Sequence, residues 1–301
     1  MAGPLGFEPR ACGSGVLDGQ IDDKNTIKPN PEEYGTVLDD FTKFMKVDLH
    51  LAIGSIRRHR GCIRKVLTCC GPDFTARQLR DFLAEIENPS TYNNYLKSLR
   101  IFCRDFLDDP EPIRTFRFAR IEFFPGRMFT KKELQEFYAA LATPKERALF
   151  LMYATSGRRR AEIIDLTLDQ INLESRIIPP NKASRTKRTW YSFFNQECKD
   201  ALLEYLEVRQ DPKRSKRIFP LGSGGKKAVF RMAQIETGIH VTPQTLRFWF
   251  ANEMARLGVS DRFIDAFQGR VPSSVIARHY TDYNLENLRQ IYEKADLKVL
   301  G

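Results

Sequence analysis

Apolar side chains recur at spacings of three and four residues over much of this chain, and this pattern limits the possible folds more than any other feature. Four such runs follow one another between Tyr34 and Leu107. Their period matches the 3.6 residues of an α-helical turn, so each run predicts a short amphipathic helix. Asn88-Pro89-Ser90 interrupts the pattern, and Ser90 is the expected N-cap of the next helix. We therefore expect a compact four-helix domain.

A break in the pattern predicts two domains. The stretch 108–128 carries three prolines and no helical period, which is typical of a linker. After it, Thr130-x-x-Glu133 has the form of a capping box at the start of a helix. The expected segments are a flexible tail at 1–30, a helical domain at 31–110, a linker at 111–128 and a second domain at 129–301.

The second domain adds one short pair of strands to its helices. Arg176–Pro180 and Thr189–Phe194 are β-like runs on either side of a polar turn. Helical stripes surround them on both sides. The expected fold class is mainly α with a small β-hairpin, an α+β arrangement.

The net charge of +10 favours a polyanionic partner such as nucleic acid. No apolar run approaches the length of a membrane span or of a signal-peptide core, so we expect an intracellular, cytoplasmic and nucleoid-associated protein without a membrane partner. The six cysteines form no zinc pattern and are expected to be reduced thiols, with a Cys69–Cys70 redox pair as the alternative.

Two segments of the second domain carry arginines in defined surroundings. The first is Thr155–Glu162, where Gly157 and Glu162 set the register for Arg159. Its neighbours, Arg158 and Arg160, should point elsewhere, because successive residues of a helix are about 100° apart. A basic helix start with three solvated arginines is the alternative.

The second segment is Thr242-Pro-Gln-Thr-Leu-Arg247-Phe-Trp-Phe-Ala251, with Gln244 one turn before Arg247. Trp249 and Phe250 are expected in the core.

A third segment carries a tyrosine. It runs from Phe267 to Asp282 and contains Arg270 and Tyr280. Tyr283 is the competing tyrosine. A lysine of the polar turn completes the set, with Lys182 as the first candidate and Lys187 as the second.

The order and context of these segments resemble the tyrosine recombinase, or phage integrase, family. That family has a Gly-x-Arg-x-x-Glu segment, then Thr-Pro-His-x-Leu-Arg-His-x-Phe-Ala, then Leu-Gly-His followed by the nucleophilic tyrosine. The resemblance implies one set of catalytic residues: Arg159, Lys182, Gln244, Arg247, Arg270 and Tyr280. Glutamine and arginine replace two usual histidines, at 244 and 270, and this arrangement resembles integrases of archaeal spindle-shaped viruses and related plasmids.

The resemblance also implies a function and partners. Residues 31–110 would be a SAM-like core-binding domain that grips double-stranded DNA attachment sites together with the catalytic domain at 129–301. The protein would integrate a mobile element through a phosphotyrosine intermediate, as a homotetramer on DNA and a monomer or dimer without it. No cofactor and no metal are expected. An apolar stripe after Tyr280, at Leu285, Leu288, Ile291, Tyr292 and Ala295, would dock on a neighbouring subunit or pack on its own domain.

The tail adds a clue about the target. The codons of Gly6–Arg10 can spell GGGTTCGAACCCCG, which contains the core of a transfer-RNA T-arm. We hypothesise that the gene overlaps an attachment site in a transfer-RNA gene, against the alternative of a meaningless tail. Other functions stay open: an Xer-like resolvase of chromosome or plasmid dimers, a catalytically decayed DNA-binding protein, and a type IB topoisomerase.

Overall fold

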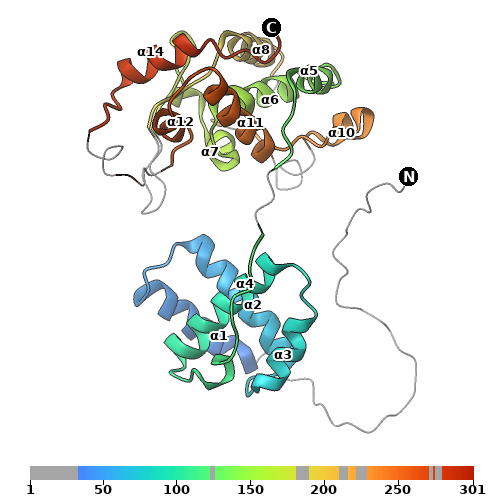
Figure 1. The fold of residues 1–301 in the computed structure, drawn as a ribbon, viewed down its shortest axis with the longest axis vertical. Coiled ribbons are helices and arrows are strands. Elements are labelled where there is room, and N and C mark those ends of the chain that lie inside the picture. Colours follow the sequence, from blue (N-terminus) through green and yellow to red (C-terminus); the bar gives the residue numbers. More distant parts are fainter. Residues whose placement is uncertain are drawn as a thin grey trace. The chain divides into compact units, whose positions relative to one another are not determined.

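The computed structural model describes residues 33–122, 126–180, 190–209, 216–221, 229–270, 274 and 280–301. They belong to two compact units, one ending at Phe123 and the other beginning at Phe124. Helices dominate both units, and one antiparallel pair of strands lies in the second, which confirms the predicted fold class (Figure 1). Among the described helices, none has the length and apolar character needed to cross a bilayer.

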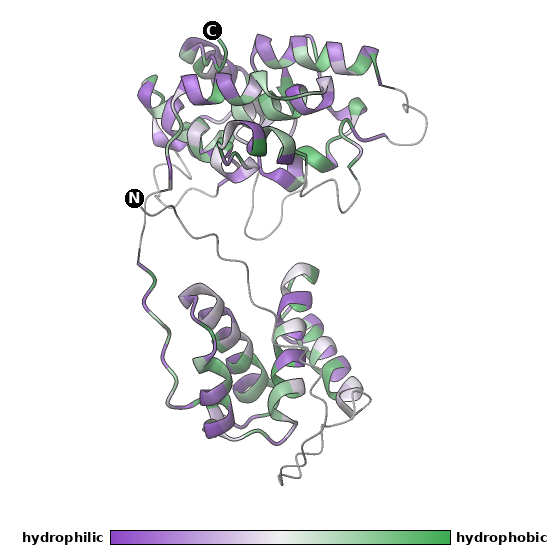
Figure 2. Ribbon diagram, turned by 90° about the vertical axis from the view of Figure 1, so that its right-hand side faces the viewer, coloured by the Kyte–Doolittle hydropathy of each residue, from purple (hydrophilic) through white to green (hydrophobic). Residues whose placement is uncertain are grey.

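The first unit contains the predicted four-helix core. Its elements are α1 (Glu33–Val47), α2 (Ile53–Cys70), α3 (Ala76–Ala84), α4 (Pro89–Leu99), the π-helical segment η1 (Arg100–Phe106) and the 3-10 turn η2 (Glu111–Ile113). Apolar residues on the inner faces of these helices form one buried cluster. In that cluster the rings of Phe41 and Phe102 meet edge to face, with centroids 5.1 Å apart. Figure 2 shows the resulting alternation of hydrophobic and hydrophilic colour around each helix.

Two predictions for this unit need correction. Asn88, not Ser90, is the N-cap of α4, because its Oδ1 accepts the N–H groups of Ser90 and Thr91 at 2.9 and 3.0 Å. The expected linker also begins too early. Ile113 and Phe116 are buried in the core of the first unit, so burial of these apolar side chains holds the start of 111–128 against it.

The second unit is built around one buried helix. Its elements are α5 (Lys131–Ala139), α6 (Pro144–Ser156), α7 (Arg160–Asp165), η3 (Leu168–Gln170), β1 (Ile177–Ile178), β2 (Ser192–Phe193), α8 (Gln196–Glu207), α10 (Arg231–Thr237), α11 (Pro243–Arg256), α12 (Asp261–Phe267) and α14 (Leu285–Ala295). Residues 148–156 of α6 are all buried, and α8 and α11 pack against this helix. A helix that is buried on every side occupies the centre of a domain. Figure 1 shows α6 in that place.

Local signals in the second unit were predicted with more success. The Thr130 hydroxyl accepts the Glu133 N–H at 3.2 Å, and Glu133 Oε2 accepts the Thr130 N–H at 2.8 Å, which confirms the capping box. The hairpin is also present, although β1 and β2 pair over only two residues each, with Ile177 opposite Phe193. Trp249 and Phe250 are buried, as predicted.

The stripe after Tyr280 packs on its own unit. In α14, Leu288, Tyr292 and Ala295 are buried in the core of the second unit. The Tyr292 hydroxyl donates to the carbonyl oxygen of Thr155, 2.8 Å away at the end of α6. The sequence left open whether this stripe docks on a neighbouring subunit or packs on its own domain, and in this structure it packs on its own domain.

Candidate active site

The first candidate arginine is presented by a tight turn at Gly157. Helix α6 ends there with φ +62°, in the left-handed region that favours glycine. A Cβ atom at this position would lie 2.5 Å from the ring of Phe250 on α11. Glycine is therefore required twice, by its backbone angle and by the close approach of α11. The turn points its own carbonyl oxygen at Arg247 on that same helix.

Replacing Gly157 with alanine is expected to destabilise the second unit strongly. Left-handed backbone costs a non-glycine residue roughly 1–2 kcal/mol, and overpacking against Phe250 adds roughly 1–3 kcal/mol. Gly238→Ala is the matched control, because Gly238 has φ +69° but no atom lies within 4 Å of the position that an alanine methyl group would take. Urea unfolding should show a larger loss for Gly157→Ala. Equal losses in the two variants would mean that the contact with Phe250 carries no cost.

Arg159 lies at the N-terminus of α7, between that helix and the segment after α12. Its NH1 donates to Glu162 Oε1 and to the carbonyl oxygen of Gly269, each at 3.0 Å. Glu162 Oε2 accepts the backbone N–H of Arg159 at 3.0 Å, so one carboxylate holds both the start of the helix and the guanidinium. The side chain stays 27% exposed, which leaves it accessible to a ligand.

Arg247, on α11, contacts the turn at Gly157 and the segment after α12. Its NH1 donates to the carbonyl oxygen of Gly157 at 2.6 Å, and its NH2 donates to that of Gln268 at 2.7 Å. The side chain is buried, and Gln268 returns a hydrogen bond from Nε2 to the Arg247 carbonyl oxygen at 2.7 Å. Burial, followed by the positive charge of Arg159, lowers the pKa of Arg247 to about 10. The guanidinium is still protonated at neutral pH, in a site with a surplus of positive charge.

Arg270 completes the cluster of candidate arginines. It directly follows Gly269, whose carbonyl oxygen accepts from Arg159, and its positive charge contributes to the lowered pKa of Arg247. Its NH1 donates to Asp265 Oδ1 at 3.2 Å, and 54% of the side chain is exposed. Gln244 is exposed in the first turn of α11, three residues before Arg247. The sequence motifs therefore meet in space around Gly157 and the residues after α12.

The two candidate tyrosines differ in their surroundings. Tyr280 is 79% exposed, and none of the described contacts of the three arginines is made to it. The ring of Tyr283 packs between Trp190 and Phe263, with centroids 5.0 and 6.2 Å away. A ring held in this way serves packing, whereas an exposed phenol is available to a substrate. Lys182 and Lys187 lie outside the described residues, as does most of the chain between Arg270 and Tyr280.

Residues 127–287, more than half of the chain, match the phage integrase family. The chain belongs to this family. It is 26% identical to the tyrosine recombinase XerA of Thermococcus onnurineus, over 88% of this chain and 95% of that one. It is 30% identical to the tyrosine recombinase XerC of Lactobacillus leichmannii, over 50% and 55% of the two chains. This confirms the resemblance to the tyrosine recombinases, which cleave and rejoin DNA strands.

Solved structures show the same fold. A lambda integrase tetramer bound to a Holliday junction has a TM-score of 0.63 at 15% identity, covering 80% of this chain and 78% of that one. A lambda integrase dimer bound to a COC' core site has a TM-score of 0.61 at 15% identity, covering 83% and 98%. The predicted integrase fold is therefore confirmed for this member of the family.

Sequence reasoning missed Arg158. The motif predicts that Arg158 is turned away from the site or solvated, but its side chain is only 1% exposed. Its NH2 donates to the carbonyl oxygens of Pro179 and Trp190, at 3.3 and 2.5 Å. Burial lowers its pKa to about 10. Nothing in the local sequence distinguishes it from Arg160, because its partners lie on the hairpin.

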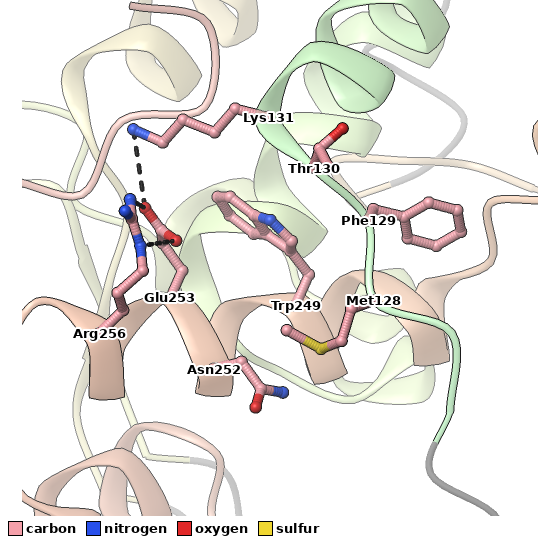
Figure 3. Close-up of a pocket in the computed structure, with 8 residues that line it drawn as sticks. All are labelled: Met128, Phe129, Thr130, Lys131, Trp249, Asn252, Glu253 and Arg256. Atoms are coloured by element: carbon pink, nitrogen blue, oxygen red, sulfur yellow. Dashed lines mark hydrogen bonds and ion pairs between the residues drawn. The ribbon is translucent and has the colours of Figure 1, made fainter.

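A pocket of about 380 Å³ lies on the other side of α11 from Arg247. Figure 3 shows Lys131, Glu253 and Arg256 directed at one another beside Trp249, with Arg256 and Lys131 held to Glu253 at 2.7 and 3.6 Å. At 100° per residue, Arg256 is turned about 180° from Arg247 around the helix. The pocket is therefore separate from the arginine cluster. In the described ranges no three His, Cys, Asp or Glu side chains are grouped to hold a metal ion.

Proposed function

We propose that this integrase-family protein recombines double-stranded DNA at specific sites through a covalent bond between Tyr280 and a 3′ phosphate. The observation that supports this most is the meeting of Arg159 and Arg247, 88 residues apart in sequence, beside Gly157 and the segment Gln268–Gly269. Backbone carbonyl oxygens orient both guanidiniums. The pKa of Arg247 is lowered in part by the other arginines, as expected where positive charge is gathered for an anion.

In this proposal the arginines hold the scissile phosphate. Each guanidinium has five N–H donors, and the described hydrogen bonds use two from Arg159 and two from Arg247. The remaining donors can bind nonbridging phosphate oxygens in the planar geometry that suits a guanidinium. They also stabilise the negative charge that grows on these oxygens in the transition state.

Tyr280 is the nucleophile of the proposed reaction. Its phenol loses a proton to solvent, the oxygen forms a bond to phosphorus, and the bond from phosphorus to the 5′ oxygen breaks. The leaving oxygen needs a proton, which Lys182 supplies, with Lys187 as the alternative donor. Because the phosphotyrosine conserves the energy of the broken bond, another 5′ hydroxyl can reverse the step and rejoin the strands.

Arg270 and Gln244 have supporting roles at the phosphate. Arg270 is largely exposed and directly follows Gly269, whose carbonyl oxygen accepts from Arg159, so it can bind a phosphate oxygen or orient Tyr280. It cannot shuttle protons as a histidine would, because arginine stays protonated. Gln244, one turn before Arg247, can donate its amide N–H to the same phosphate.

Double-stranded attachment sites are the proposed partner, with a homotetramer as the active assembly on DNA. The net charge of +10 supports binding to phosphate backbones, and that binding should weaken steeply with salt. The similar lambda integrase structures, a dimer on a core site and a tetramer on a Holliday junction, support an assembly of the same kind.

We further propose that the protein integrates a mobile element at a transfer-RNA gene. Gln244 and Arg270, together with the Gly6–Arg10 string, support this finer assignment, although Gly6–Arg10 lies outside the described residues. The second candidate is a resolvase of chromosome or plasmid dimers. Similarity to XerA over 88% of the chain favours that candidate.

Trapping on nicked DNA tests the function and the target together. The scissile strand carries a nick just beyond the cleavage site, so the short product is lost and the covalent adduct accumulates. We expect a DNA–protein adduct with a duplex that contains the transfer-RNA T-arm sequence and none with a scrambled duplex. An adduct on an Xer-type dimer-resolution site alone would favour the second candidate. Tight binding without an adduct on any duplex would contradict an active recombinase.

A further inference from the structure

Arg158 is a buried charge that the proposed reaction does not use. Its side chain is 1% exposed and lies next in sequence to Arg159. Taking a guanidinium out of water costs several kcal/mol unless its surroundings compensate. In the described part of the chain its Nε has no hydrogen-bond partner, so the compensation is incomplete. An apolar side chain of similar volume would avoid this cost, and stability alone does not account for an arginine here.

Arg158 connects the two strands of the hairpin, at the end of β1 and just before the start of β2. Its NH2 donates to Pro179, just after β1, and to Trp190, just before β2. In the sequence, Lys182 follows Pro179 by three residues and Lys187 precedes Trp190 by three. One guanidinium therefore holds Pro179 and Trp190 together. These are the positions between which the chain carries both candidate lysines.

The same arginine is tied to the candidate active site. Its NH1 lies 4.0 Å from Glu162 Oε2, and Glu162 Oε1 accepts from Arg159 at 3.0 Å. A second connection runs from the Ser192 hydroxyl on β2 to the carbonyl oxygen of Ser156, 2.7 Å away at the end of α6. The base of the hairpin is thus fixed to the turn that presents Arg159, on the side where Trp190 packs against Tyr283.

We propose that Arg158 is a positioning residue for the general acid. It holds the lysine-bearing hairpin against the Arg159 turn, so that the lysine reaches the 5′ oxygen when the bond to phosphorus breaks. This inference rests on the proposed phosphotyrosine function. Arg158 has no contact with DNA in this role, because its side chain is enclosed by protein.

A sulfur-substituted substrate separates this role from a general structural one. In a nicked duplex whose scissile 5′ oxygen is replaced by sulfur, the leaving group is a thiolate. A thiol has a pKa of about 8.5, so the thiolate leaves without a proton from the enzyme. Single-turnover adduct formation is measured on the oxygen and sulfur duplexes with wild type, Arg158→Met, Arg158→Lys, Lys182→Ala and Lys187→Ala. Loss of a general acid typically slows a step roughly 10²–10⁴-fold.

The expected result is a selective defect. Arg158→Met should slow cleavage of the oxygen substrate by at least about tenfold and at most by the roughly 10²–10⁴-fold expected for complete loss of the general acid, and it should cleave the sulfur substrate at nearly the wild-type rate. One of the lysine variants should show the same pattern. Arg158→Lys keeps the charge but not the planar set of guanidinium donors, so its cleavage rate on the oxygen substrate should fall between those of wild type and Arg158→Met. DNA affinity should be unchanged. Thermal unfolding is measured beside the rates, because Arg158→Met removes the present donor to the Pro179 and Trp190 carbonyl oxygens.

Two other results would overturn the proposal. Equal slowing on both substrates would assign Arg158 to the general integrity of the site, and normal cleavage of both would leave it without a role in the reaction. Failure of the wild-type protein on both substrates is a distinct outcome, because it would contradict the proposed function itself and the inference with it.

Discussion

Replacing Tyr280 with phenylalanine is expected to abolish the covalent DNA adduct completely, since the variant lacks the oxygen that forms the proposed phosphotyrosine bond. Tyr283→Phe should keep the adduct, because the Tyr283 ring is held by Trp190 and Phe263 and its packing survives loss of the hydroxyl. The Tyr280 phenol, in contrast, is 79% exposed. The pair of variants therefore distinguishes the two tyrosines by a change of one atom each.

The measurement is the fraction of nicked duplex that migrates with protein on a denaturing gel. DNA affinity of each variant is determined in parallel, so that a lost adduct is not mistaken for lost binding. An adduct that survives in Tyr280→Phe and disappears in Tyr283→Phe would move the nucleophile to position 283. It would also require the Trp190–Tyr283 contact to open before the reaction.

Arg247→Met is expected to slow single-turnover cleavage roughly 10²–10³-fold, the usual effect of removing one preorganised donor to a developing negative charge. Arg247→Lys should recover only part of the rate, because an ammonium cannot make the two parallel hydrogen bonds of a guanidinium. Both variants also leave the carbonyl oxygens of Gly157 and Gln268 without their present donors. Thermal unfolding must therefore accompany the rate measurement.

Arg256→Met is the matched control on the same helix. Arg256 lies on the opposite side of α11, 67% exposed, and pairs with Glu253. Glu253 is itself buried, but Lys131 stays 3.6 Å from its carboxylate, so this variant should keep its cleavage rate, and its stability is measured by the same thermal unfolding. A rate loss as large in Arg256→Met as in Arg247→Met would show that the effect comes from disturbing α11 and not from the phosphate site.

Much of the local structure could be predicted because its causes are local. The capping box at Thr130 and the apolar stripes depend on residues three or four apart, which a single sequence displays directly. The N-cap of α4 was placed two residues too late because Asn88, Pro89 and Ser90 are all favourable near a helix start. Only the hydrogen bonds of Asn88 decide between Asn88 and Ser90.

The sequence by itself determined the family, since spaced motifs around Arg159, Arg247 and Tyr280 identify it without any contact being known. The tertiary structure alone decided that Arg158 is buried while Arg160 is exposed, and that Tyr283 is packed while Tyr280 is not. The reason is physical: helical period fixes the direction of a side chain relative to its own helix. What it meets there, such as the hairpin carbonyl oxygens for Arg158, comes from segments far away in the chain.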